Sequence, residues 1–357
     1  MTFVALLTRY IRQLCLKYET WLLVILFVLI YSYIFHTDRL RSVIRGAQEQ
    51  LHLRGDRREE YDTIDATDTS TPKTPSHWDI RQNNVALYAI QGRRPRMEDR
   101  YDIVHDAEHT GLSMYGIFDG HGGEFASDFV EKILSKSVLA REMENTMNKG
   151  IHGHSQILTE EILSTDHQLL SVAKISNDVA GTTCLFAMLD DKNKNLIVAN
   201  VGDSRGVLCD HDGKAIPLSY DHKPHQLKER KRIKRAGGFI SYNGVWRVAG
   251  ILATSRALGD YPLKEKNFLI ADPDILTFDL DELNPQFMIL ATDGLWDAFS
   301  NEEAVMYIKE RLDEPHFGAK SLVLQAYYRG SLDNITVMVV NFLKTNGKNW
   351  VKEERKL

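Results

Sequence analysis

The most informative segment of the chain is Tyr115-Gly-Ile-Phe-Asp-Gly-His-Gly-Gly123. An apolar run, typical of a buried strand, stops at Asp119, and three glycines then surround His121. Glycine tolerates positive φ and lets the backbone approach a ligand closely. A helix predicted to begin near Glu124 would add an N-terminal field that favours anions. The segment is typical of a metal or phosphate site, although an ordinary strand-to-helix turn has the same pattern.

Three further aspartates lie at the ends of strand-like apolar runs: Asp203, Asp293 and Asp333. Clustered carboxylates are costly unless a cation neutralises them. Oxygen ligands without cysteine favour Mg²⁺ or Mn²⁺ over zinc. Two such ions about 4 Å apart can activate water for phosphate-ester hydrolysis. Each aspartate taken alone is also explained by a turn, a cap or an ion pair, such as Asp203 with Arg205.

A cation precedes a carboxylate pair in Arg94-Pro-Arg-Met-Glu-Asp99. An arginine can bind a phosphate group through two parallel hydrogen bonds. Arg94 is therefore a candidate phosphate ligand, with Glu98 and Asp99 as candidate members of the acidic cluster. An exposed charged loop is the alternative interpretation of this segment.

Composition sets the broad class of the protein. The chain has 357 residues, of which 43% are hydrophobic and 26% charged, so we expect one large globular domain with additional segments. Its net charge of −5 argues against a nucleic-acid partner. The three cysteines are odd in number and lack metal-type spacing, which favours a reduced intracellular compartment.

The N-terminal part contains an uncharged apolar span. After a short segment of residues 1–19, residues 20–37 would reach about 27 Å as a helix, close to the thickness of a bilayer core. Trp21, Tyr31 and Tyr33 lie near its ends, where aromatic rings prefer the headgroup level. A cleaved signal peptide would need a small-residue cleavage site, and a buried core helix would not precede a polar linker. We expect a transmembrane anchor.

Flanking charge does not orient this anchor, because three basic residues lie on each side of it: Arg9, Arg12 and Lys17 before, and Arg39, Arg41 and Arg45 after. The glycosylation sequon Asn334-Ile-Thr336 is more informative, because it directly follows Asp333. A glycan on Asn334 would block the predicted site, and such glycans are added only to segments outside the cytosol. We therefore expect the large domain to face the cytosol.

Residues 38–80 are predicted to be a flexible polar stalk, since the run DTIDATDTSTPKTPS (62–76) has almost no apolar content to bury. Residues 84–343 are the predicted catalytic domain, and 344–357 a charged tail.

Within the domain we expect helices at 124–139, 156–170, 227–236 and 319–328, and another after a capping box at Ser300. We expect strands at 85–90, 101–104, 113–118, 182–189, 196–201, 206–210, 275–278, 287–291 and 334–342, and a hairpin at 239–248. Hairpin-linked strands outnumber crossovers, which favours an α+β fold of antiparallel sheets covered by helices.

The motifs resemble those of the type 2C, metal-dependent Ser/Thr protein phosphatases (PPM family), and stand in that family's order over about residues 84–342. They are Arg94-x-x-x-Glu98-Asp99, Asp119-Gly-His-Gly-Gly123, Ala180-Gly-Thr-Thr183, Asn200-Val-Gly-Asp-Ser-Arg205, Asp221-His-Lys-Pro224, Leu252-Ala-Thr-Ser-Arg-Ala-Leu-Gly-Asp260, Ala291-Thr-Asp-Gly-Leu-Trp-Asp297 and Asp333-Asn334. The anchor and the segment 223–261 resemble the membrane-anchored, protein phosphatase 1-like branch of the family.

This resemblance implies two packed antiparallel sheets between helical layers and a site for two Mn²⁺ or Mg²⁺ ions. The implied ligands are Asp119, Asp293, Asp333 and the carbonyl of Gly120. Glu98 and Asp99 would act through waters, at or just behind the ions. A third, weaker ion would be held by Asp203 and Asp297.

The resemblance also implies the chemistry. Arg94 would hold the substrate phosphate, and His121 would be the general acid for the leaving serine or threonine oxygen, a task that suits an unperturbed pKa near about 6.5. Metal-activated water would attack phosphorus directly. Neither Cys184 nor Cys209 belongs to a Cys-x5-Arg phosphatase loop, so no covalent phosphoenzyme is expected.

The branch resemblance implies an endoplasmic reticulum address, phosphorylated protein substrates that include stress-activated kinases, and a monomer. One alternative is a catalytically weak membrane scaffold that binds kinases. Another is a two-metal nuclease or small-molecule phosphoesterase. The basic run of residues 228–235 is interpreted as a solvated helix face, with a nuclear signal or a binder of acidic surfaces as alternatives.

Overall fold

The computed structural model describes residues 77–147 and 152–344. The predicted anchor (20–37), the segment before it and nearly all of the predicted stalk and tail lie outside these residues. Within the described ranges, no helix has both the length and the apolar character that crossing a membrane requires.

Two antiparallel sheets form the centre of the domain. The first has the strand order β1 (His77–Gln82), β2 (Val85–Ile90), β16 (Ile335–Asn341), β15 (Phe287–Ala291), β9 (Arg205–Cys209) and β10 (Ala215–Pro217). The second has the order β14 (Asp274–Asp279), β8 (Asn195–Val201), β7 (Cys184–Asp190), β4 (Leu112–Phe118) and β3 (Arg100–Val104). Every pairing within the two sheets is antiparallel, as predicted.

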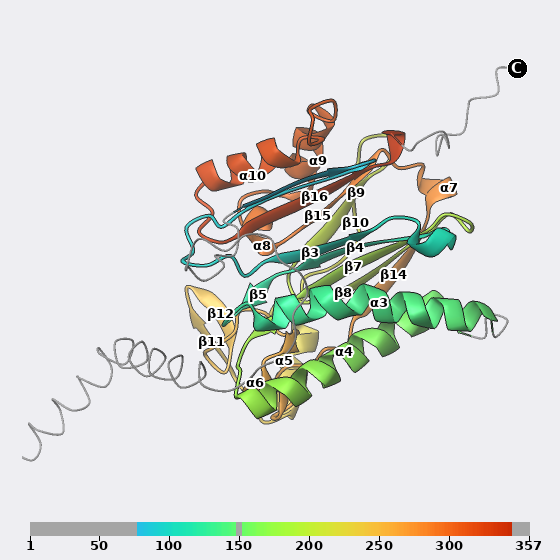
Figure 1. Cartoon of the computed structure of the whole chain (residues 1–357). Coiled ribbons are helices and arrows are strands. Elements are labelled where there is room, and N and C mark those ends of the chain that lie inside the picture. Colours follow the sequence, from blue (N-terminus) through green and yellow to red (C-terminus); the bar gives the residue numbers. More distant parts are fainter. Residues whose placement is uncertain (1–76, 148–151, 345–357) are drawn as a thin grey trace, which may run out of the picture. The chain divides into compact units, whose positions relative to one another are not determined.

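Helices cover the outer face of each sheet, so the domain has four layers (Figure 1). On the first sheet lie α8 (Asp293–Trp296), α9 (Asn301–Lys309) and α10 (Ala319–Tyr328); on the second lie the long helices α3 (Phe125–Met147) and α4 (His154–Ser176). The predicted α+β sandwich is thus confirmed. The capping box is confirmed too: Ser300 Oγ accepts from the Glu303 amide at 3.2 Å, and Glu303 Oε2 accepts from the Ser300 amide at 2.9 Å.

Burial on both faces explains why the central strands lack a polar alternation. In β2, Val85, Leu87 and Ala89 belong to the core between the two sheets, whereas Ala86 and Tyr88 belong to the core under α9 and α10. Successive side chains of a strand point to opposite faces, so both sets must be apolar.

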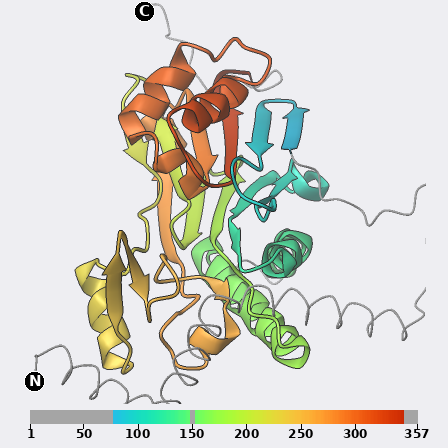
Figure 2. The same ribbon diagram turned by 90° about the vertical axis from the view of Figure 1, so that its left-hand side faces the viewer.

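A small side lobe, residues 227–269, projects from one end of the domain (Figure 2). It contains α5 (Leu227–Arg235), the hairpin of β11 (Ile240–Asn243) and β12 (Val245–Val248), and α6 (Tyr261–Lys264). Its own core consists of Ile233, Val248, Leu263 and Leu269. On α5 the basic side chains of Lys228, Arg230, Lys231, Lys234 and Arg235 are exposed, as expected for a solvated face. The remaining short elements are α7 (Leu280–Leu283), η1 (Ala107–His109) and η2 (Phe342–Lys344).

The structure differs from the prediction in two places that matter. The polar stalk was predicted to reach residue 80, but β1 already begins at His77, because Trp78 and Ile80 pack against the core between the sheets. The single strand predicted at 182–189 is divided into β6 (Gly181–Thr182) and β7 at Thr183. The Thr183 amide donates to the Asp119 carbonyl at 2.9 Å, and Thr183 Oγ1 accepts from the Asp119 amide at 3.0 Å.

Candidate active site

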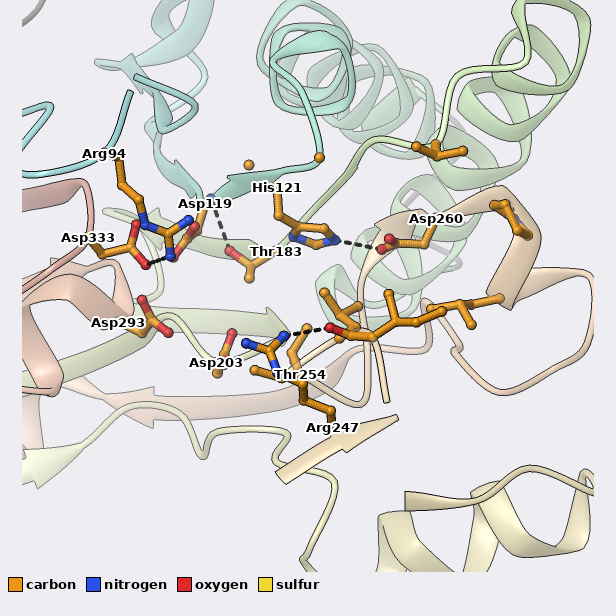
Figure 3. Close-up of a pocket in the computed structure, with 18 residues that line it drawn as sticks. Arg94, Asp119, His121, Thr183, Asp203, Arg247, Thr254, Asp260, Asp293 and Asp333 are labelled. Atoms are coloured by element: carbon orange, nitrogen blue, oxygen red, sulfur yellow. Dashed lines mark hydrogen bonds and ion pairs between the residues drawn. The ribbon is translucent and has the colours of Figure 1, made fainter. Parts of the chain in front are cut away.

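Topology brings the predicted aspartates to one edge of the sheets. Strands β4 and β8 both pair antiparallel with β7, so they run in the same direction and end together, at Asp119 and Asp203. In the other sheet β15 ends where its antiparallel partner β16 begins, next to Asp293 and Asp333. These ends open into a cavity of about 530 Å³ (Figure 3). The predicted residues that line it are Arg94, Asp119, Gly120, His121, Asp203, Asp293 and Asp333.

The carboxylates of this cavity repel one another. Burial, followed by the charges of Asp99, Asp293 and Asp333, raises the pKa of Asp119 well above its usual value. Burial and the charge of Asp203 likewise raise the pKa of Asp293. A cation placed among these groups would relieve both effects.

Two basic side chains already lie against the cluster. Arg94 Nη2 lies 2.5 Å from Asp333 Oδ2, as Figure 3 shows. Lys223 Nζ lies 2.6 Å from Asp203 Oδ2 and 3.9 Å from Asp293 Oδ2. The alternative partner of Asp203, Arg205, instead forms a bidentate pair with Asp221 at 2.8 Å for both contacts. Lys223 belongs to the motif Asp221-His-Lys-Pro224, but nothing in its spacing indicates contact with Asp203.

The remaining predicted carboxylates lie outside the cavity lining. Asp99 is fully buried; its Oδ2 accepts from Thr336 Oγ1 at 2.6 Å and from Thr292 Oγ1 at 3.2 Å, whereas Oδ1 has no hydrogen-bond partner. Burial raises the pKa of Asp99 to about 7, and the negative charge of Asp333 contributes to this increase. Burial also raises the pKa of Glu98 and of Asp297.

These features fit divalent cations. The donor set consists of hard oxygen atoms, carries excess negative charge and includes the unpartnered buried Oδ1 of Asp99, which suits Mg²⁺ or Mn²⁺. Among the residues that the structure describes, one group of three potential metal-ligating side chains has its ligand atoms within 4.8 Å of one another. It consists of Asp210, His211 and Asp212, in a turn outside the cavity. The cavity carboxylates are therefore spread more widely than a compact three-ligand site.

Asp260 holds the imidazole of His121, with His121 Nε2 and Asp260 Oδ2 2.8 Å apart (Figure 3). A small sheet sets this distance: Gly181 of β6 pairs with His121 of β5 (Gly120–His121) and with Gly259 of β13 (Leu258–Gly259). A Cβ at Gly181 would lie 2.5 Å from His121 Nε2 and 2.0 Å from Asp260 Oδ2, so the pair requires glycine there. Asp260 ends the motif of residues 252–260, but no local pattern indicates this contact with His121.

The negative charge of Asp260 raises the pKa of the His121 imidazole. Burial lowers the pKa of His121, but the charge and hydrogen bond of Asp260, with the charges of Asp203 and Glu98, raise it more. The pKa of His121 therefore lies above its usual value, which favours the protonated ring, the form that can act as a general acid.

Gly294 lets the two strand ends approach. It directly follows Asp293, and a Cβ on it would lie 2.0 Å from the backbone oxygen of Asn334, the neighbour of Asp333. We expect Gly294→Ala to lower the free energy of unfolding by about 3 kcal/mol, because the backbone must move. Chemical denaturation measures this. Gly153→Ala, where no atom lies within 4 Å of the added Cβ, should lose at most about 1 kcal/mol; equal losses would contradict the prediction.

Known proteins resemble this chain in sequence and structure. Residues 83–335 match the family described as Protein phosphatase 2C. Protein phosphatase 1L of Bos taurus is 54% identical over 348 residues, covering 96% of each chain. Probable protein phosphatase 2C 59 of Arabidopsis thaliana is 43% identical over 267 residues, covering 74% of this chain and 82% of its own. The crystal structure of serine-threonine phosphatase 2C from Toxoplasma gondii has a TM-score of 0.65 and 25% identity, covering 74% of this chain and 98% of its own.

The family match spans most of the described domain, and it includes the strand ends that form the acidic cavity. Members of this family depend in general on Mn²⁺ or Mg²⁺, which agrees with the oxygen-rich donor set. The chain belongs to the protein phosphatase 2C family and is a protein serine/threonine phosphatase.

Proposed function

We propose that the acidic cavity holds two Mn²⁺ or Mg²⁺ ions and hydrolyses phosphoserine and phosphothreonine in proteins. The observation that carries this proposal is the convergence of Asp119, Asp293 and Asp333 on one cavity with Arg94 and His121. The ions would be held by these three aspartates with Gly120, by Glu98 and Asp99 through waters, and by Asp203 and Asp297 at a third, weaker position. When bound, the ions supply an activated water and stabilise charge on the phosphoryl group.

The side chains of this chain position the substrate and move a proton. Arg94 lies half-exposed at the cavity and would exchange its contact with Asp333 for the substrate phosphate. His121, held by Asp260, would donate its proton to the departing serine or threonine oxygen. The amide and the carbonyl of Asp119 are both hydrogen-bonded to Thr183, which would hold this proposed ligand in place.

Phosphate release from a phosphothreonine peptide tests this function. The full-length chain, purified in mild detergent, is assayed with Mn²⁺, with Mg²⁺ and with a chelator. We expect release that requires either ion and stops on chelation, and little hydrolysis of DNA. Release that persists in a chelator would contradict the proposal, because the carboxylate cluster would then have no part in the reaction.

Asp260→Asn should change the pH dependence of turnover. Asp260 raises the pKa of His121, so its loss lowers that pKa. The acid form of His121 is the active one, so the alkaline limb of the kcat profile should move to lower pH. A pH–rate profile on a phosphopeptide measures the shift. An alkaline limb that stays in place would show that His121 is not the proton donor or that Asp260 does not control it.

A catalytically weak scaffold that binds kinases is the alternative function. It is disfavoured because the chain retains every predicted carboxylate, and the cavity brings Asp119, Asp203, Asp293 and Asp333 together with Arg94 and His121. Stress-activated kinases are proposed substrates of the active enzyme, and the chain is proposed to act as a monomer without a nucleic-acid partner. A substrate-trapping Asp293→Asn variant that captures phosphorylated kinases, but not their unphosphorylated forms, would support substrates over scaffold clients.

We propose further that residues 20–37 anchor the chain in a membrane, that of the endoplasmic reticulum by resemblance to the branch, with residues 84–343 in the cytosol. The Asn334 sequon supports this orientation. Asn334 is buried; its Nδ2 donates to the carbonyls of Gln91 at 2.7 Å and Arg96 at 2.9 Å, and its Oδ1 accepts from the Glu98 amide at 2.8 Å. A glycan on Nδ2 would prevent this packing.

Protease protection in sealed microsomes tests the orientation. We expect added protease to digest the catalytic domain without detergent, and glycosidase to leave the size of the chain unchanged. A protected domain, or a glycan on Asn334, would contradict the proposed topology.

A further inference from the structure

Lys223 occupies an unusual position for a lysine, with its ammonium group inside the acidic cluster. Nζ lies 2.6 Å from Asp203 Oδ2 and 3.9 Å from Asp293 Oδ2, and 27% of the side chain is exposed. Asp203 has only 7% of its side chain exposed, so this ion pair is largely shielded from solvent. The ammonium group therefore provides much of the positive charge on this side of the cluster.

Backbone hydrogen bonds of the preceding residue fix the position of Lys223 beside Asp203. The preceding residue, His222, donates its amide to the Gly202 carbonyl at 2.9 Å, and its Nδ1 accepts from the Gly202 amide at 3.0 Å. The His222 carbonyl accepts from Thr254 Oγ1 at 3.0 Å and from the Ser255 amide at 2.8 Å. Lys223 is thus tied to the segment that carries Asp203, and Pro224 restricts its backbone further.

A divalent ion at this side of the cluster would use the same carboxylate, that of Asp203. Asp203 and Asp297 are the proposed ligands of the weak third ion, and the ammonium group of Lys223 also lies 3.9 Å from Asp293, a proposed ligand of the other two. An ion bound to either oxygen of Asp203 at about 2.1 Å, a usual Mg²⁺ distance, would lie within a few ångström of the ammonium group and repel it. The two cations therefore exclude each other.

We propose that Lys223 is an internal competitor of the third divalent ion. In the absence of that ion the ammonium group neutralises Asp203 and Asp293, and the third ion binds only when it displaces Lys223. This inference rests on the proposed function, because it takes the third ion position from it. It explains why this position would bind more weakly than the two formed by Asp119, Asp293 and Asp333, and it makes occupancy depend on a side chain that can turn away toward solvent.

Calorimetric titration of the full-length protein with Mn²⁺ tests the competition. We expect Lys223→Gln to lower the Kd of the weakest Mn²⁺ site by about tenfold or more, since a unit charge a few ångström away is worth at least about 1.4 kcal/mol at an effective dielectric constant of about 20. The two tight sites should change much less. Lys228→Gln is the matched control, because Lys228 is 78% exposed and lies 3.7 Å from Asp274.

Further variants separate competition from a general change in charge or fold. Asp203→Asn in the Lys223→Gln background should remove the gain in affinity, and Lys223→Arg, which keeps the charge, should bind Mn²⁺ much as the unaltered chain does. Thermal unfolding gives a second readout: without metal Lys223→Gln should melt at a lower temperature than the unaltered chain, and Mn²⁺ should raise its melting temperature by more.

The titrations distinguish a failure of the proposed function from a failure of the proposed role of Lys223. If the unaltered chain binds no Mn²⁺ at the cluster, the proposed function itself fails. If it binds two tight ions but Lys223→Gln leaves the weak site unchanged or weakens it, the proposed function stands and Lys223 supports the ligands instead of competing with an ion.

Discussion

Asp293→Asn is expected to abolish Mn²⁺-dependent phosphate release, with kcat/KM at least about 1,000-fold lower, or about 4 kcal/mol of lost transition-state stabilisation. Asp293 lines the cavity, and burial with the charges of Asp203 and Asp333 raises its pKa. An amide keeps its shape but removes the negative charge and one good ligand oxygen. Initial rates at saturating Mn²⁺ on a phosphothreonine peptide measure the loss.

Asp212→Asn is a suitable control for that variant. Asp212 belongs to the trio Asp210, His211 and Asp212, which also brings ligand atoms within 4.8 Å but lies outside the cavity. Its replacement should leave kcat/KM unchanged. If Asp293→Asn retains more than about a tenth of the activity while Asp212→Asn loses it, the reaction depends on another metal position.

His121→Gln is expected to lower kcat on a phosphopeptide by about 100-fold to 10,000-fold, the usual range for loss of a general acid. The serine or threonine alkoxide is a poor leaving group and needs the proton that His121 carries. With p-nitrophenyl phosphate the phenolate leaves without a proton, so the same variant should lose much less. Comparing kcat on the two substrates measures this difference.

An equal loss on both substrates would contradict the role of His121 as proton donor. It would indicate that the imidazole instead supports the neighbouring ligands Asp119 and Gly120. Asp260→Asn helps to separate these cases, since it leaves His121 in place and changes only the group 2.8 Å from Nε2.

Much of the site could be predicted because it follows from local patterns. An apolar strand that ends at an aspartate and a glycine is visible in sequence, and Asp119, Asp203 and Asp293 were all recognised in this way. Antiparallel pairing then places such ends together, as with β4 and β8 on either side of β7. The layered fold followed from the number of hairpin-linked strands.

The missed contacts depend on tertiary distances that no local pattern contains. Lys223 reaches Asp203 across 20 residues, where His222 bonds to Gly202. Asp260 reaches His121 across 139 residues, where both flanking strands pair with β6. Strand β1 was missed for another reason: its outer face is polar, so only Trp78 and Ile80 mark it against the stalk. A two-residue apolar signal is too short to distinguish an edge strand from a linker.

Anomalous diffraction from crystals grown with Mn²⁺ tests the two-ion site most directly. The proposal predicts two strong manganese peaks about 4 Å apart among Asp119, Asp293 and Asp333, with any third, weaker peak near Asp203 and Asp297. A single peak in the cavity, or manganese bound only at Asp210, His211 and Asp212, would contradict it.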